Sequence, residues 1–156
     1  MIEIDIPGWK TLRLQHLICD YNGTLSLDGV LIGGVAPLLT TLAQQLQVHV
    51  LTGDGLGTAR AQLAGLPCHV EITPPEQQAL TKLNYVHRLG ADGIAAIGNG
   101  RNDRLMLEAA ALGIAVIGGE GASSATVAAG DVVAAGIVDA LELLLNPSRL
   151  RATLRA

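Results

Sequence analysis

The chain has 156 residues and a net charge of −4, and apolar residues make up 49% of it, although only 2% are aromatic and phenylalanine is absent. This length suits a single domain, residues 1–156, whose core must come from Leu, Ile, Val and Ala, as in a parallel sheet covered by helices. The acidic charge argues against nucleic-acid and anionic-membrane partners, and the lack of a membrane-length apolar run or a signal peptide leads us to expect a cytoplasmic protein.

The N-terminal part of the chain predicts two hairpins around a buried strand. Residues 2–6 alternate apolar and acidic side chains and are followed by a Pro-Gly pair, so we expect them to pair with a strand over residues 11–19. That strand leads directly into Asp20. An Asp-Gly pair at residues 28–29 lies between apolar residues, which indicates a hairpin turn and predicts a small β-flap beside the end of the strand.

The rest of the chain alternates strand-like apolar runs with helical patterns. The expected strands cover residues 48–51, 68–72, 94–97, 114–117 and 132–133. The expected helices cover residues 35–45, 56–63 and 74–89, a segment ending near residue 112, residues 123–129 and a C-terminal region. Thr73 is the expected N-cap of the helix over residues 74–89, whose first turn opens with two prolines. The alternation predicts a doubly wound, Rossmann-like parallel sheet with helices on both faces.

Three of these strands end in polar, glycine-bearing turns, at residues 20–24, 52–54 and 98–103. The first turn alone is explained equally well by an ordinary strand-to-loop connection with a capping side chain. Because the carboxyl ends of parallel strands meet at one edge of a sheet, all three turns are expected to converge there. Convergence of three such turns favours a chemical site.

The side chains in these turns are those that phosphoryl transfer requires. Asp20 and Asp103, with amide oxygens nearby, form an all-oxygen environment suited to Mg²⁺. Thr52 and the Gly53 amide offer neutral donors to an anion. Lys82, on the helix before the third of these strands, could add a positive charge, although by itself it would be interpreted as a solvated surface lysine. Together these groups can stabilise the charge that develops on a transferring phosphoryl group.

These residues resemble the motifs of the haloacid dehalogenase-like superfamily of phosphotransferases. The run Asp-Tyr-Asn-Gly-Thr-Leu at residues 20–25 resembles its first motif, Asp-x-Asp-Gly-Thr, and Thr52 and Lys82 resemble the second and third. The run Gly-Asn-Gly-Arg-Asn-Asp at residues 98–103 resembles the fourth. This run and Leu-Thr-Gly-Asp at residues 51–54 are also similar to the phosphorylation domain of P-type ATPases, so the chain resembles a soluble P-type-ATPase-like hydrolase.

The resemblance implies a role for each of these residues. Asp20 would be the nucleophile that forms an aspartyl-phosphate, and Asn22 would occupy the position of the family's acid–base residue. The implied phosphate-binding residues are Thr52, Gly53 and Lys82. The implied ligands of the Mg²⁺ cofactor are Asp20, Asn22, Asn99 and Asp103.

Two amides, Asn22 and Asn99, stand where the family usually has aspartate. Asn22 can orient a substrate but has no proton to exchange near neutral pH, and the loss of an acid–base group typically costs roughly 10²–10⁴-fold in rate. P-type ATPases also carry a non-acidic residue at this position, which the resemblance implies prolongs the aspartyl-phosphate. Asn99 keeps a neutral oxygen for a metal but removes one negative charge from the site.

The spacing of the motifs leaves no room for a cap domain. Only the flap lies between Thr24 and the helix expected from residue 35, and only a helix, a strand and the start of a helix lie between Thr52 and Lys82. Capless members of the family have an open site, and some close it by forming a homo-oligomer. The apolar flap residues could form such an interface or pack on their own domain; they are Leu27, Val30, Leu31 and Ile32.

The sequence therefore supports two functional hypotheses. The first is a magnesium-dependent phosphohydrolase or phosphotransferase that acts on a small phosphorylated substrate through an aspartyl-phosphate at Asp20, slowed by Asn22. The second is a catalytically impaired regulatory or phosphate-binding module with the same fold, which Asn22 and Asn99 motivate equally well.

Overall fold

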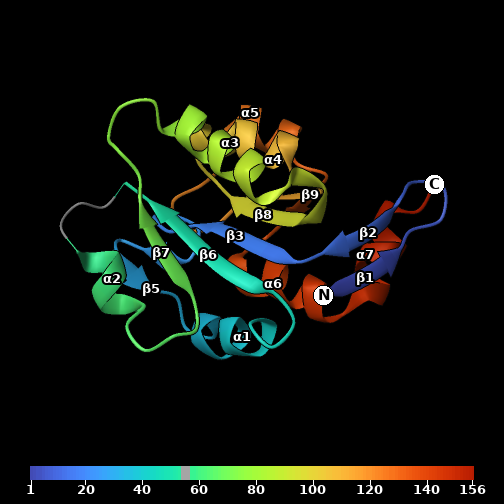
Figure 1. Ribbon diagram of the computed structural model, residues 1–156, viewed down its shortest axis with the longest axis horizontal. Coiled ribbons are helices and arrows are strands. Elements are labelled where there is room, and N and C mark those ends of the chain that lie inside the picture. Colours follow the sequence, from blue (N-terminus) through green and yellow to red (C-terminus); the bar gives the residue numbers. More distant parts are fainter. Residues whose placement is uncertain (54–56) are drawn as a thin grey trace.

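A six-stranded parallel sheet forms the centre of the computed structural model, which describes residues 1–53 and 57–156 (Figure 1). The strands run in the order β10-β9-β8-β3-β6-β7, and every neighbouring pair is parallel. Their bounds are β3 His16–Asp20, β6 Gln47–Thr52, β7 His69–Ile72, β8 Ile94–Gly98, β9 Leu112–Val116 and β10 Val132–Ala134. Since β3 is central and the chain winds first to one side of it and then to the other, the predicted doubly wound sheet is confirmed.

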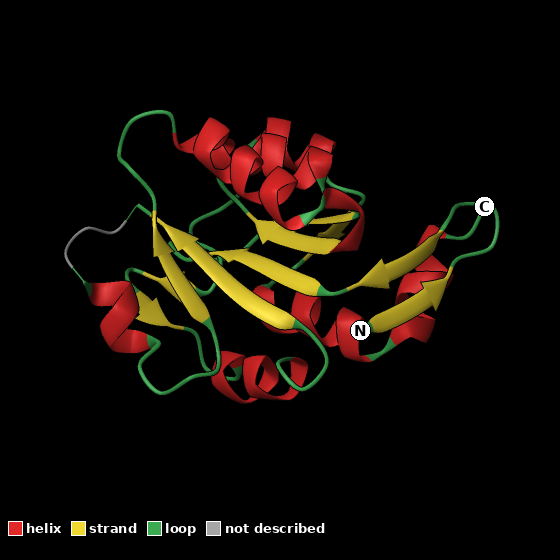
Figure 2. Cartoon of the chain, in the orientation of Figure 1, coloured by secondary structure: helices red, strands yellow, loops and turns green. Residues whose placement is uncertain are grey.

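Helices cover both faces of this sheet, as Figures 1 and 2 show. One face carries α1 (Val35–Leu42) and α6 (Ile137–Leu145), and the other carries α3 (Gln78–Leu89), α4 (Arg104–Ala109) and α5 (Ser124–Ala129). Successive side chains of a strand point to opposite faces. Leu17 and Cys19 of β3 therefore join the apolar cluster that contains α1 and α6, whereas Ile18 joins the cluster that contains α3 and α4.

Two small antiparallel hairpins flank the central sheet. The first pairs β1 (Ile2–Asp5) with β2 (Thr11–Leu14), and the C-terminal helix α7 (Pro147–Leu154) packs beside it (Figure 1). The second is the predicted flap, β4 (Ser26–Leu27) with β5 (Val30–Leu31). The flap lies near α2 (Thr58–Gln62), whose Gln62 Oε1 accepts the backbone N–H of Leu31 at 3.0 Å.

The flap is the only element that the described residues form between β3 and α1, so the predicted absence of a cap at this position is confirmed. Its apolar residues differ in how they pack. Leu31 and Ile32 pack against the core, while Leu27 and Val30 at the tip are 43% and 60% exposed. Among the described helices, none has the length and apolar character needed to cross a bilayer.

The prediction for the start of α3 is wrong. The helix begins at Gln78 instead of Pro74, and Thr73 does not cap it. Two consecutive prolines supply no backbone N–H and push the residues before them away from helical angles. The chain enters the helix only after Gln77, whose φ is 56°. The delayed start matters because it places Gln78 at the edge of the sheet where the polar turns meet.

Other differences are smaller and occur at element ends. The strand expected over residues 11–19 is divided at Gln15, whose N–H donates to the carbonyl of Gly93 at 2.8 Å, so the hairpin strand and β3 are separate. The helix expected over residues 56–63 is observed as α2, and its first expected residue, Leu56, lies outside the described residues. The C-terminal helical region is two helices, α6 and α7, which Pro147 separates.

Candidate active site

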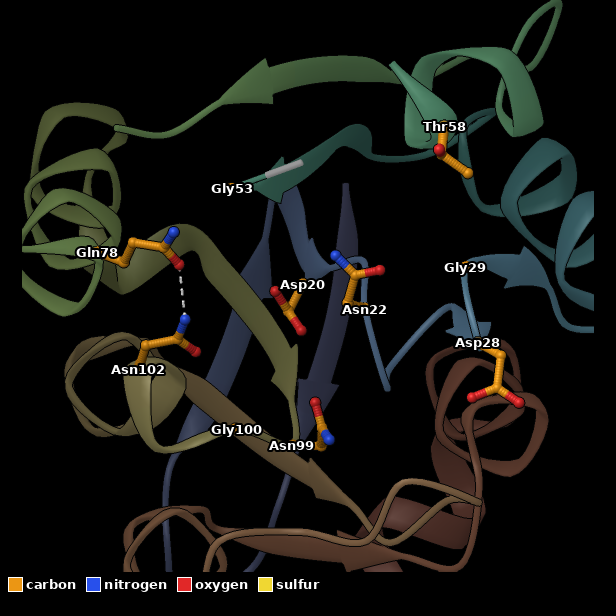
Figure 3. A pocket seen from close by; sticks show the side chains of 10 residues that line it. All are labelled: Asp20, Asn22, Asp28, Gly29, Gly53, Thr58, Gln78, Asn99, Gly100 and Asn102. Atoms are coloured by element: carbon orange, nitrogen blue, oxygen red, sulfur yellow. Dashed lines mark hydrogen bonds between the residues drawn. The ribbon is translucent and has the colours of Figure 1, made fainter. Parts of the chain in front are cut away.

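Asp20 is the last residue of β3 and lies at the centre of the carboxyl edge of the sheet. Its side chain reaches a cavity of about 530 Å³ (Figure 3). The residues lining the cavity are Asp20, Asn22, Asp28, Gly29, Gly53, Thr58, Gln78, Asn99, Gly100 and Asn102. They come from all three predicted polar turns, from the flap and from the first residues of α2 and α3. The predicted convergence is therefore what the structure shows.

Lys82 is the group that holds the site together. It lies on α3 with a side chain only 1% exposed, and its Nζ donates to Asp20 Oδ1 and to Asp103 Oδ1, each at 2.7 Å. Burial by itself lowers the pKa of Lys82, but the two carboxylates outweigh burial and raise the pKa above its ordinary value. Lys82 is therefore a permanent buried cation, and the interpretation as a solvated surface lysine does not apply.

The Asp20 carboxylate is buried but has polar partners on both oxygens. Oδ1 accepts from Lys82, and Oδ2 accepts from the Thr24 hydroxyl at 3.3 Å. Burial and, after it, the charge of Asp103 raise the pKa of Asp20, against the lowering effect of Lys82 and Thr24. A carboxylate with a raised pKa in a polar cavity is a stronger base and nucleophile than an exposed aspartate, which is the arrangement that functional sites often show.

Asp103 is fully buried and its oxygens are already engaged. Oδ1 accepts from Lys82, and Oδ2 accepts the backbone N–H groups of Asn99 and Gly100 at 3.1 and 2.9 Å. Its side chain fills the space beside Gly98, where a Cβ would collide with it. Asp103 thus orients Lys82 and shapes the turn at residues 98–103, and it is not among the residues that line the cavity.

Two amides bring further oxygen atoms to the cavity. Asn99 Nδ2 donates to the carbonyl of Gly121 at 3.0 Å, and Asn99 Oδ1 accepts from the Thr24 hydroxyl at 3.1 Å. Thr24 also donates toward Asp20, so the Asn99 oxygen is held on the Asp20 side. Asn22 is exposed and stands beside Asp20 in the cavity (Figure 3). A carboxylate and two amide oxygens form a donor set that suits a hard cation such as Mg²⁺.

Thr52 and Gly53, the predicted phosphate-binding turn, differ in their exposure to the cavity. Thr52 ends β6 and is buried, whereas Gly53 lines the cavity. A Cβ on Gly53 would collide with the side chain of Gln78, so the glycine permits the close approach of α3. Asp54, the last residue of this predicted turn, lies outside the described residues.

Three polar residues that line the cavity were not predicted from the sequence, namely Asp28, Thr58 and Gln78, and Asn102 was predicted only as part of the turn at residues 98–103. Gln78 Oε1 accepts from Asn102 Nδ2 at 2.8 Å and forms one wall with it (Figure 3). Gln78 was missed because its position depends on the delayed start of α3. The Asp-Gly turn at residues 28–29 predicted the flap, but no sequence pattern indicates that its tip faces Asp20.

Comparison with known proteins gives one sequence relative and a group of similar folds. No protein-family model matches the chain. A Methanocaldococcus jannaschii protein, described as uncharacterized, is 60% identical over 82 residues, which span 50% of this chain and 88% of that protein. A 3-deoxy-D-manno-octulosonate 8-phosphate phosphatase from Moraxella catarrhalis, solved with magnesium, phosphate and its sugar, superposes with a TM-score of 0.72 and 17% identity, over 91% of this chain and 94% of that one.

Two further structures extend this similarity. A Legionella pneumophila protein described as a hydrolase of HAD superfamily subfamily III A gives a TM-score of 0.68 and 20% identity, over 90% of this chain and 87% of that one. A zinc-transporting PIB-type ATPase gives 0.59 and 25% identity, over 79% of this chain and 20% of the ATPase. At such identities the similarity concerns the fold, and the chemistry has to be argued from the residues of the cavity.

Proposed function

We propose that the chain is a member of the haloacid dehalogenase-like superfamily, whose capless fold it shares, and that it is a metal-dependent phosphohydrolase acting through an aspartyl-phosphate at Asp20. The observation that carries the proposal is the buried Lys82 ammonium between Asp20 and Asp103. Breaking such a pair leaves uncompensated buried charge. A fold has little structural reason to place this arrangement at the floor of a polar cavity, whereas phosphoryl transfer requires it.

The reaction would proceed in two displacements. The Asp20 carboxylate attacks phosphorus, the bond from phosphorus to the leaving alcohol oxygen breaks, and the alcohol takes a proton from water because Asn22 has none to give. Water then attacks phosphorus, the bond to Asp20 breaks and inorganic phosphate leaves. Lys82 offsets the negative charge around Asp20, and the backbone N–H of Gly53 would offer a donor to a phosphoryl oxygen.

A divalent cation fits the donor set of this cavity. The oxygens of Asp20, Asn22 and Asn99 would hold it, and Asp103 would support it indirectly through Lys82 and the turn at residues 98–103. When bound, the cation would neutralise charge on the phosphoryl group. With Asn99 in place of a carboxylate the site has one charge fewer, so we expect Mg²⁺ to bind more weakly than in a site with two or more carboxylates.

The first test is hydrolysis of a generic phosphate ester, p-nitrophenyl phosphate. We expect slow phosphate release with Mg²⁺ and none above background with EDTA. Acid-quenched protein should carry one phosphoryl group, which peptide mapping assigns to the peptide that contains Asp20. Release that is insensitive to EDTA, or a phosphoryl group on another residue, would contradict the proposal.

A second candidate function is a phosphate-binding module without turnover, and the amides Asn22 and Asn99 are the observation that favours it. The two functions separate in a thermal-shift measurement with Mg²⁺ and beryllofluoride, alongside the hydrolysis assay. Stabilisation without detectable turnover identifies the module. Turnover above the buffer background rejects it.

Asn22→Asp tests what limits the rate. The two side chains are nearly isosteric, and Asn22 is exposed in the cavity beside Asp20, so the substitution adds an acid–base group without displacing the backbone. We expect hydrolysis to rise by roughly 10-fold or more and the phosphoenzyme to become shorter-lived, because a carboxylate can activate the attacking water. The measurements are the steady-state rate and the acid-quenched phosphoenzyme level at saturating Mg²⁺.

Asn99→Asp is the matched comparison, since it restores a charge near the cation without placing a base beside the attacking water. It should lower the Mg²⁺ concentration needed for activity and leave the lifetime of the phosphoenzyme nearly unchanged. If Asn22→Asp is no faster and its phosphoenzyme lives as long, the acid–base step does not limit turnover, and metal binding at Asn99 becomes the next explanation.

The remaining proposals concern the domain organisation, substrate, assembly and location of the protein. We propose that residues 1–156 act as one domain on a small phosphorylated substrate. The sugar-acid phosphate named for the Moraxella catarrhalis enzyme is a useful test compound, because its carboxylate shows whether the cavity accepts an anionic leaving group. The acidic net charge makes a nucleic-acid substrate unfavourable. The exposed apolar side chains of Leu27 and Val30 could be buried in a homo-oligomer, which we propose as the assembly. We also propose a cytoplasmic location, because both cysteines are free.

A further inference from the structure

We propose that the leaving alcohol of the substrate carries no anionic group, so that the substrates are phosphate monoesters of neutral, hydroxylated alcohols. This inference rests on the proposed function, because it concerns the group that is released at Asp20. It follows from the charged and hydrogen-bonding groups that line the cavity. The end beside the flap is negative, and the opposite wall carries neutral donors and acceptors.

Among its described lining residues, the cavity has no cation to pair with a second anion. These residues include Asp20 and Asp28 but no Lys, Arg or His, and residues 54–56, which lie outside the described part, contain none either. Lys82 is buried beneath the cavity and both its carboxylate partners are at 2.7 Å. Its charge and that of a bound divalent cation would be outweighed by Asp20, Asp103 and the dianionic phosphoryl group.

The flap end of the cavity is negative. Asp28 lies at the tip of the flap and lines the cavity, and its backbone N–H donates to Glu120 Oε2 at 3.3 Å. This end is held in place, because the buried Tyr21 donates its hydroxyl to the carbonyl of Gly29 at 2.8 Å. A substrate carboxylate or second phosphate here would meet the carboxylate of Asp28, with that of Glu120 next to the flap tip. Like charges about 5 Å apart repel enough to cost roughly tenfold in affinity even near a protein surface.

The opposite wall offers neutral donors and acceptors. Because Gln78 Oε1 accepts from Asn102 Nδ2, the wall presents the Gln78 amide hydrogens as donors and Asn102 Oδ1 as an acceptor. The Thr58 hydroxyl at the edge of the cavity can do both. Hydroxyl groups also donate and accept, so a polyol or a neutral sugar satisfies this lining, whereas a carboxylate accepts only.

Arginines are present nearby but do not line the described part of this cavity. Arg101 and Arg104 line a second hollow, which shares only Asn102 with the cavity at Asp20. Arg104 also lies 3.7 Å from the carboxylate of Glu108. A short substrate whose phosphate is at Asp20 therefore has no described arginine beside its leaving group, and small esters are the appropriate probes.

The experiment compares glycerol 3-phosphate with 3-phosphoglycerate, which share a three-carbon skeleton and differ by a hydroxymethyl group in place of a carboxylate. With Mg²⁺ in excess, we expect kcat/KM for glycerol 3-phosphate to be at least about tenfold higher, which corresponds to about 1.4 kcal/mol. Sorbitol 6-phosphate and 6-phosphogluconate form a longer pair that also differs by a hydroxymethyl group in place of a carboxylate. We expect sorbitol 6-phosphate to have the higher kcat/KM. A thermal-shift titration with each ester gives a second readout that needs no turnover.

Asp28→Asn tests whether the Asp28 carboxylate causes the preference for glycerol 3-phosphate. Asn tolerates the left-handed backbone of this position, where φ is 51°. We expect the preference for glycerol 3-phosphate over 3-phosphoglycerate to narrow by about threefold or more, since one carboxylate is removed from the flap end. Asp92→Asn is the matched control, because Asp92 is exposed before β8, at the opposite edge of the sheet, and should leave the ratio unchanged.

The outcomes separate this inference from the proposed function. Hydrolysis of both esters with equal kcat/KM, or faster hydrolysis of 3-phosphoglycerate, overturns the inference while the phosphohydrolase stands. Selective thermal stabilisation by glycerol 3-phosphate without hydrolysis overturns the phosphohydrolase, and the inference about its leaving alcohol falls with it. A wild-type preference that Asp28→Asn does not alter, or no response to any of the four esters, also overturns the inference.

Discussion

Replacing Lys82 with methionine is expected to lower the free energy of unfolding by about 3–5 kcal/mol and to abolish phosphatase activity. Methionine retains most of the side-chain volume, so the effect reports the lost charge and not a cavity. The substitution leaves Asp20 and Asp103, with side chains 10% and 0% exposed, facing each other without a cation. Urea denaturation at constant pH measures the loss of stability.

The loss of free energy of unfolding in Lys82→Met should be larger at neutral pH than at acidic pH. Burial and the charge of Asp103 already raise the pKa of Asp20, and without the ammonium nothing as strong opposes them, so ionisation of Asp20 is costly only in the folded state. The destabilisation is therefore present at neutral and alkaline pH and shrinks as pH falls and Asp20 becomes protonated. Adding Asp103→Asn to the variant should recover part of the stability at neutral pH, because one of the unpaired charges is removed.

The other lysine of the chain supplies the control. Lys10 lies in the turn between β1 and β2, which contributes no residue to the described lining of the cavity, and its Nζ lies 4.1 Å from the ring centroid of Trp9. Lys10→Met should change the free energy of unfolding by less than about 1 kcal/mol, as is usual for a surface cation. An equal loss in both variants, or a loss in Lys82→Met that does not shrink in acid, would show that Lys82 is not a structural counter-ion.

The fold could be predicted from the sequence because its signals are local. Alternating apolar runs and helical patterns specify a parallel sheet, and the strand ends at residues 20–24 and 98–103 locate its functional edge. The absence of a cap follows from the short spacing between motifs. These conclusions need only the order of elements along the chain, which explains why small errors at element ends did not affect them.

The details of the site depend on contacts that no local pattern encodes. Burial of Lys82 is set by the packing of α3 against the sheet and α4, and an exposed helical lysine has the same local sequence signature. The start of α3 is controlled by the two prolines before it, and this delay brings Gln78 against Gly53. The position of Asp28 depends on the contact between the flap and Tyr21. Contacts between separate elements therefore determine the burial of Lys82 and the position of Asp28, whereas the delayed start of α3 is a local effect of prolines that are visible in the sequence.

Asp20→Asn is expected to reduce hydrolysis at least about 10³-fold, to the background level, because an amide cannot form the phosphoryl intermediate. The loss should occur without a loss of stability. Lys82 keeps its partner Asp103 at 2.7 Å, and the substitution removes a carboxylate whose burial raises its pKa and so opposes its ionisation. We therefore expect the free energy of unfolding at neutral pH to stay equal or to rise, while stabilisation by beryllofluoride with Mg²⁺ disappears.

The combination of results identifies the role of Asp20 more firmly than the loss of activity alone. Asp92→Asn makes the same chemical change at the opposite edge of the sheet and should leave both hydrolysis and beryllofluoride binding intact. A variant that is inactive and also unstable would mean that Asp20 serves the fold. Activity that persists in a stable Asp20→Asn protein would show that the phosphoryl group is transferred directly to water, since no other described carboxylate in the cavity lies beside Lys82.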